Sequence, residues 1–128
     1  MFYEELYPEL GKLFFYIAAI DGKVQPSEKK ALQNLIQNNW KPLENSTDKY
    51  GTDQANLIDF AFEYEEAEGS SENILQSFEI FYQENKKKFS SAIIDNILLT
   101  GKAIASAYRG ENKDEHRVLK RLIQLFEN

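Results

Sequence analysis

Carboxylates gather at two predicted turns of this chain. Asp21 and Glu28 flank the first turn, and Glu111, Asp114 and Glu115 surround the second. Hard cations such as Ca²⁺ and Mg²⁺ prefer oxygen ligands of this kind. The acids therefore predict a divalent-cation site, provided that the two turns pack against each other. The simpler alternative is that Asp21 bonds the backbone of its own turn and Glu28 caps the next helix.

The segment 19–28 shares its spacing with the second half of an EF-hand loop. In that loop a glycine makes the sharp turn and a final glutamate binds calcium through two oxygens. If Glu28 were the twelfth loop position, Ile17 and Ala19 would take the first and third positions, and neither side chain carries oxygen. The register therefore argues against an EF-hand.

Other kinds of reactive site find little support. The chain has no cysteine, which excludes disulfides, thiol nucleophiles and cysteine-bound metals. Its single histidine, His116, excludes a two-histidine mechanism and is expected on the exposed surface. The sequence has neither a G-x-S-x-G nucleophile elbow nor a glycine loop for phosphate. We therefore predict that the chain is not an enzyme.

Composition and charge indicate one domain over residues 1–128. The chain is 42% hydrophobic, which suffices for a single core, and its net charge of −6 argues against nucleic-acid binding. Between Tyr50 and Asn85 there are nine acids and no base. The simplest interpretation is a solvated helix face. The alternative is that the acidic 53–84 face docks a basic protein partner without any metal.

Neither a secretion signal nor a membrane span is expected. The first residues are acidic rather than basic, and the longest apolar run covers eight residues, Leu13–Ile20. A spanning helix needs about twenty. The sequence thus predicts a cytoplasmic chain without membrane insertion.

Apolar residues at helical spacing predict an all-α bundle of about six helices, and no segment alternates as a strand does. The first helix has Pro8 in its first turn and ends at Gly22, and it should lie in the middle of the bundle because it is apolar nearly all round. The second starts at Pro26, with Glu28 reaching back to cap it, and stops at Pro42.

The remaining helices are marked by caps and breaks. Thr52 or Asp53 caps the third, whose predicted inward residues are Leu57, Ile58, Ala61 and Phe62. The fourth follows the break at 69–71, Ser90 caps the fifth and Asn112 caps the sixth. Gly101 lies inside the fifth helix, where glycine costs about 1 kcal/mol against alanine. Together with Ala105 it predicts a close helix crossing.

The pattern E-x-x-x-L-x-x-L-I occurs twice, over 28–36 and over 115–123. Gly22 precedes the first copy and Gly110 the second, and an apolar helix precedes each glycine. The repeat predicts two similar helix–turn–helix units, which pack about a pseudo-twofold with the acidic helices between them. In that arrangement the two acidic turns would face each other.

Residues 16–24, with Pro26, Glu28 and Leu32, resemble the signature of the TerB-like tellurite-resistance family. Segment 104–123 resembles the second signature, and segments 40–43 and 51–53 are similar to small stand-alone bacterial members. The resemblance implies an all-helical fold, a cytoplasmic role in tellurite or envelope stress, and a protein partner that the sequence does not identify. It also implies a divalent-cation site, with Ca²⁺ or Mg²⁺ held by Asp21, Glu28 and Glu115.

The chain departs from that family pattern at one position. Arg109 stands where the second signature would carry aspartate. An arginine there repels a cation, and it can pair with Asp21 across the pseudo-twofold in place of a metal. The predicted function is a non-enzymatic TerB-like module with a divalent-cation site that the charge of Arg109 opposes. The alternative is a metal-free interaction module that uses the acidic 53–84 face.

Overall fold

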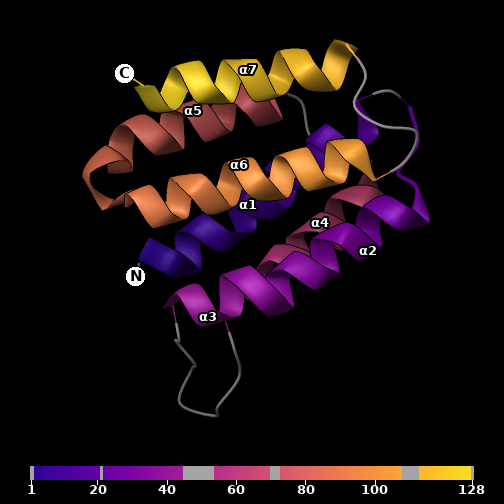
Figure 1. Cartoon of the computed structure of the whole chain (residues 1–128), viewed down its shortest axis with the longest axis horizontal. Coiled ribbons are helices and arrows are strands. Elements are labelled where there is room, and N and C mark those ends of the chain that lie inside the picture. The colour runs from indigo at the N-terminus through magenta and orange to yellow at the C-terminus, as the bar shows by residue number, and fades with distance from the viewer. Residues whose placement is uncertain (1, 21, 45–53, 70–72, 108–112, 128) are drawn as a thin grey trace.

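The computed structural model describes residues 2–20, 22–44, 54–69, 73–107 and 113–127. Over these residues the chain is all-helical, without a strand (Figure 1). The elements are α1 (Phe2–Ala19), α2 (Pro26–Leu35), a π-helical turn (Ile36–Trp40), α3 (Lys41–Glu44), α4 (Asn56–Glu68), α5 (Ile74–Asn85), a 3₁₀ turn (Lys86–Lys88), α6 (Ser91–Ser106) and α7 (Lys113–Glu127). Within the described residues, no helix is both long and apolar enough to span a membrane.

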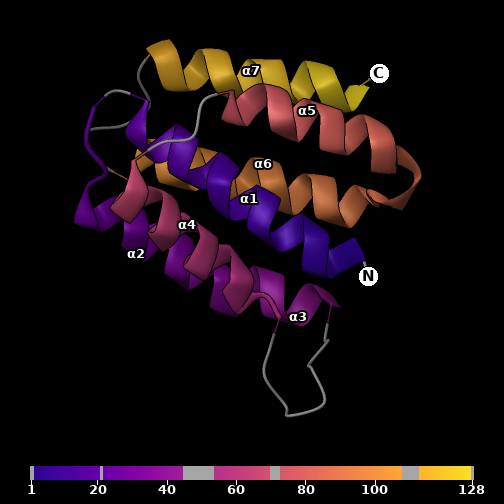
Figure 2. The same ribbon diagram turned by 180° about the vertical axis from the view of Figure 1, so that it is seen from behind.

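Helix α1 is the centre of the bundle, as its apolar sequence predicts. It contacts α4, α5 and α6, and both views show it crossing among them (Figures 1 and 2). Half of its residues are buried, and Leu10, Leu13, Phe14 and Ile17 are completely so. The other helices contribute one apolar stripe each to the same core.

The first helix begins earlier than predicted. Pro8 lies inside α1 rather than in its first turn, because the helix starts at Phe2. An interior proline costs about 3 kcal/mol, since it removes a hydrogen bond and crowds the carbonyl four residues back. The added turns bury Leu6 and Tyr7 completely. Burial of such side chains stabilises a fold by about 1.5–3 kcal/mol each, which offsets the effect of the proline.

The second helix does not stop at Pro42, contrary to the prediction. It passes through the π turn into α3, so that helical backbone continues to Glu44. In the π turn the Lys41 N–H donates to the carbonyl of Ile36, five residues back instead of four. Pro42 is then the second residue of a new α-helical turn, where its missing N–H and fixed φ are tolerated.

The π turn carries the only tryptophan of the chain into the core. Trp40 is completely buried, and its Nε1 donates to Thr100 Oγ1 on α6 at 2.9 Å. Thr100 in turn donates to the carbonyl of Asn96 at 2.7 Å. The rings of Tyr7 and Phe14 on α1 pack beside the indole, with centroids 6.3 Å away in each case. Trp40 thus joins three helices.

Two glycines allow close helix contacts. A Cβ placed on Gly11 would meet the carbonyl of Ile58 and lie 2.5 Å from Ala61 Cβ, so α1 and α4 touch backbone to backbone there. At Gly101 a Cβ would lie 3.0 Å from Leu119 Cδ2 and 3.2 Å from Ile17 Cδ1. These neighbours are side-chain ends and not backbone, so the close helix crossing predicted at Gly101 with Ala105 stays a prediction.

The predicted helix caps have different outcomes. Ser90 caps α6, with the Ile93 N–H donating to Ser90 Oγ at 3.2 Å, as predicted. Thr52, Asp53 and Asn112, the caps predicted for the helices now assigned as α4 and α7, lie outside the described residues.

Candidate functional site

The helices that flank the two predicted turns share one end of the molecule. The last turns of α1 and α6 and the first turns of α2 and α7 all lie at one end of the long axis (Figures 1 and 2). The helices that carry Glu28 and Glu115 therefore begin at the same end of the long axis, α7 at its upper side in Figure 1 and α2 at its lower side. Asp21, Arg109, Gly110 and Glu111 lie outside the described residues, so their predicted pairings stay predictions.

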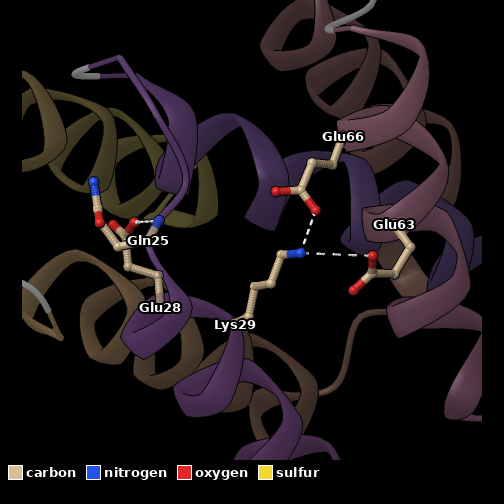
Figure 3. A network of polar contacts seen from close by, with 5 residues as sticks. All are labelled: Gln25, Glu28, Lys29, Glu63 and Glu66. Atoms are coloured by element: carbon tan, nitrogen blue, oxygen red, sulfur yellow. Dashed lines mark hydrogen bonds and ion pairs between the residues drawn. The ribbon is translucent and has the colours of Figure 1, made fainter.

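Glu28 performs the capping role that the simpler alternative gave it. Its Oε1 accepts a hydrogen bond from the Gln25 backbone N–H at 2.7 Å, and the two residues form a capping box at the start of α2 (Figure 3). The side chain is 3% exposed, so it is a buried carboxylate. One of its oxygens is therefore already used by the backbone, whatever else the carboxylate binds.

Glu115 is also buried, at 1% exposure in the first turn of α7, where a carboxylate is favoured by the helix dipole. Glu28 and Glu115 thus both lie inside the protein rather than on its surface. Among the described residues, however, no three acidic or histidine side chains gather as a metal site. A site built from three such side chains would therefore need residues outside the described part of the chain.

The acidic 53–84 stretch is not the uniform solvated face of the simplest interpretation. Glu65 is 2% exposed and points into the protein. Lys29 of α2 reaches between Glu63, at 3.8 Å, and Glu66 (Figure 3). On α5, the Glu79 carboxylate accepts hydrogen bonds from Nε and Nη2 of Arg121 on α7, at 3.0 and 2.9 Å. Helices from elsewhere in the chain thus neutralise part of the stretch.

One face of α4 remains open to solvent. Five exposed residues follow the i, i+3, i+4, i+7, i+8 spacing of a single helix face: Phe60, Glu63, Tyr64, Ala67 and Glu68. We call these five residues the α4 stripe. Phe60 is 65% and Tyr64 64% exposed, more than any other large hydrophobic residue in the described part of the chain.

The α4 stripe was not singled out from the sequence, although the signal was present. The residues predicted to face inward leave Phe60 and Tyr64, four residues apart, on the opposite side of the helix. Glu65 had a signal too. It lies three residues after the buried Phe62, which places it on the inner face of α4. His116 is exposed, as predicted.

Burial raises the pKa of Asp59 above its ordinary value, and the nearby Lys29 charge lowers it in part. The hydrogen bond to Glu66 raises the pKa of Lys29, with further support from the charges of Glu63, Glu66 and Asp59 and opposition from burial. Lys29 therefore stays charged at neutral pH, while Asp59 resists ionisation more than an exposed aspartate does.

These shifts predict how Asp59→Asn changes the pH dependence of stability. Because the folded-state pKa of Asp59 is raised, the Asp59 contribution favours folding at low pH and is lost as pH rises through that pKa. Asp59→Asn should therefore gain stability relative to the wild type across this range. Urea unfolding at a series of pH values measures the difference. If Asp59→Asn instead lost stability relative to the wild type as the pH rises, the raised pKa of Asp59 would be contradicted.

Comparison with models of protein families, with curated proteins and with solved structures finds no match to this chain. The resemblance to the TerB-like family therefore rests on the sequence motifs alone.

Proposed function

We propose that this chain is a non-enzymatic protein-interaction module whose docking surface is the α4 stripe. The observation that carries the proposal is the exposure of Phe60 and Tyr64, at 65% and 64%, on one face of one helix. Large aromatic residues contribute most of the energy of many protein interfaces. Two of them side by side on a solvent-facing helix are typical of a contact surface rather than of scattered apolar exposure.

The chemistry of the stripe favours a basic, arginine-bearing helix as its partner. Glu63 and Glu68 accompany the two rings, and the whole stretch from Tyr50 to Asn85 contains no base that would repel a cation. A guanidinium stacks on aromatic faces and pairs with carboxylates in a planar fork, so arginine satisfies both features at once. Glu63 also forms an ion pair with Lys29, yet its side chain is still 47% exposed to solvent.

The test uses a fluorescently labelled amphipathic peptide of about 15 residues, long enough to form a helix, with arginine and leucine on one face. Fluorescence anisotropy measures its affinity for the wild type and for Phe60→Ser with Tyr64→Ser. We expect the double variant to lose about tenfold in affinity, equivalent to about 1.4 kcal/mol. A twin peptide with glutamine for arginine should bind weakly to both proteins.

The matched control is Leu99→Ser with Ile123→Ser, which removes two exposed apolar residues from α6 and α7 instead. This variant should bind the arginine peptide within about twofold of the wild type. Equal losses in the two double variants, or no loss in the α4 variant, would show that the stripe does not carry the interaction.

A second candidate function is the TerB-like module with a divalent-cation site at Asp21, Glu28 and Glu115, acting in a cytoplasmic tellurite or envelope-stress response. Two observations favour it: Glu28 and Glu115 are both buried, and their helices begin at the same end of the molecule (Figure 1). Asp21, in the first sequence motif, would complete the set. The stress role follows from the family resemblance.

Thermal melting with EDTA or with millimolar Ca²⁺, Mg²⁺ or Mn²⁺ tests this second candidate, because a cation that binds only the folded chain raises its melting temperature. The rise should disappear in Asp21→Asn with Glu28→Gln, in which glutamine preserves the capping oxygen. Glu5→Gln with Glu84→Gln, two exposed acids elsewhere, should respond like the wild type. No rise in the wild type would eliminate the cation site and leave the interaction module.

A further inference from the structure

A groove runs between α6 and α7, in a region that the α4 stripe does not include. Its volume is about 400 Å³, and its lining residues are Leu98, Lys102, His116, Leu119, Lys120 and Ile123. This volume lies within the range of small-molecule sites, which is about 300–1,000 Å³. The groove is therefore large enough to take a small ligand rather than only water.

The lining combines an apolar floor with cations and contains no acid. The aliphatic surface of the groove comes from Leu98, Leu119 and Ile123. Ile123 is 44% exposed, so part of this surface is open to solvent. Lys102 and Lys120 are both exposed. In a chain with a net charge of −6, a groove whose charged lining residues are all basic attracts anions, and its aliphatic floor favours an anion with an apolar body.

Helix geometry separates the two kinds of surface along the groove. On α7, His116 and Lys120 form one row and Leu119 and Ile123 a second, each with a spacing of four residues. Because α6 and α7 run antiparallel (Figure 1) and Gly101 faces Leu119, Lys102 lies toward the start of α7 and Leu98 toward its end. The groove is thus more basic toward the start of α7 and more apolar toward Ile123.

The length of the groove decides between a small ligand and a helix. Residues 116–123 cover about 10 Å along α7, at 1.5 Å per residue. That is the length of roughly seven or eight methylene units of an extended alkyl chain, but it is under two turns of helix. A docked helix would leave most of its apolar face uncovered.

We propose that the α6–α7 groove binds a medium-chain aliphatic carboxylate. The alkyl chain lies on Leu98, Leu119 and Ile123, and the carboxylate lies within reach of Lys102 and Lys120. This site is independent of the α4 stripe, so neither proposal depends on the other. The proposal commits to a free carboxylate and not to a membrane surface.

Amide NMR of the isotope-labelled full chain tests the proposal, with decanoate as the probe below its micelle-forming concentration. We expect chemical-shift changes confined to 98–102 and 116–123. Lys102→Glu with Lys120→Glu should weaken decanoate binding by at least about tenfold. Both side chains are exposed, so the variant should fold, and its amide spectrum verifies this.

The matched control is Lys86→Glu with Lys87→Glu, which makes the same change in net charge at the far end of α6. This control should bind decanoate within about twofold of the wild type. Decanol, which has the same alkyl chain without the charge, should bind at least about tenfold more weakly than decanoate.

Three results would overturn the proposal. If decanol and decanoate bind with equal affinity, the groove is only an apolar surface and does not recognise the carboxylate. Shift changes spread over the whole chain would mean non-specific binding. Vesicles of anionic phospholipid that perturb the groove when free decanoate does not would identify a membrane surface instead.

Discussion

Gly11→Ala is expected to lower the free energy of unfolding by about 3 kcal/mol and the melting temperature by about 10 °C. The new Cβ would press on the carbonyl of Ile58 and lie 2.5 Å from Ala61 Cβ and 3.0 Å from the Phe62 nitrogen. These are backbone atoms and a β-carbon, which cannot rotate away. Helix α4 would have to move off α1. Thermal and urea unfolding followed by circular dichroism measure the loss.

Gly101→Ala is the matched control, because it is the same substitution inside another helix. The new Cβ would meet Leu119 Cδ2 and Ile17 Cδ1, which are the ends of flexible side chains. Alanine also gains about 1 kcal/mol over glycine in helix propensity. The stability of Gly101→Ala should stay within about 1 kcal/mol of the wild type. A Gly11 variant as stable as this control would contradict the close contact of α1 and α4.

Trp40→Ala is expected to cost about 4 kcal/mol, the typical effect of truncating a fully buried large aromatic side chain. The substitution removes the contacts of the indole with Tyr7 and Phe14 and leaves a cavity where the π turn meets α1 and α6. It also removes the hydrogen bond to Thr100. Urea unfolding monitored by circular dichroism gives the free energy.

Thr100→Val separates the hydrogen bond from the packing. Valine has nearly the shape of threonine but leaves the buried Trp40 N–H without its acceptor, so a loss of about 1–3 kcal/mol is expected. Since Trp40 is the only tryptophan, its fluorescence reports the change in the surroundings of the indole directly. A Thr100 variant with unchanged stability and unchanged emission would mean that the hydrogen bond contributes nothing to the fold.

The fold follows from the sequence where the determining interactions are local. Pro26 begins α2 and Ser90 caps α6 because each acts on the backbone within a few residues, and such effects are readable from spacing. The apolar period likewise identifies many of the buried residues, such as Ile58 and Phe62 of α4, although Ile123 of α7 is exposed. Glu28 reaches back to Gln25 three residues away, so its capping role was equally predictable.

The errors lie where distant contacts override a local preference. Pro8 and Pro42 are helix-breaking by themselves, and nothing in the neighbouring residues shows that α1 and the π turn accommodate them. In each case large side chains before the proline are buried against other helices: Leu6 and Tyr7 in α1, and Trp40 before Pro42. Gly11 gives no sequence signal of its role, because the approach of α4 depends on tertiary packing.

The candidate site was predictable only in part. The repeated pattern around Glu28 and Glu115 indicates two related helix starts, and both acids are buried at one end of the bundle. The acidic stretch, in contrast, predicts charge but not its distribution. Lys29 and Arg121 reach it from helices remote in the sequence. Lys29 also pairs with Glu63 of the α4 stripe, while Phe60 and Tyr64 stay exposed.

The most direct test of the α4 stripe is an amide NMR titration of the isotope-labelled chain with the arginine-bearing peptide. The proposed function predicts that the largest chemical-shift changes fall on Phe60, Glu63, Tyr64, Ala67 and Glu68, with those of α6 and α7 small. Largest changes on α6 and α7, or at the shared end of α2 and α7, would contradict it.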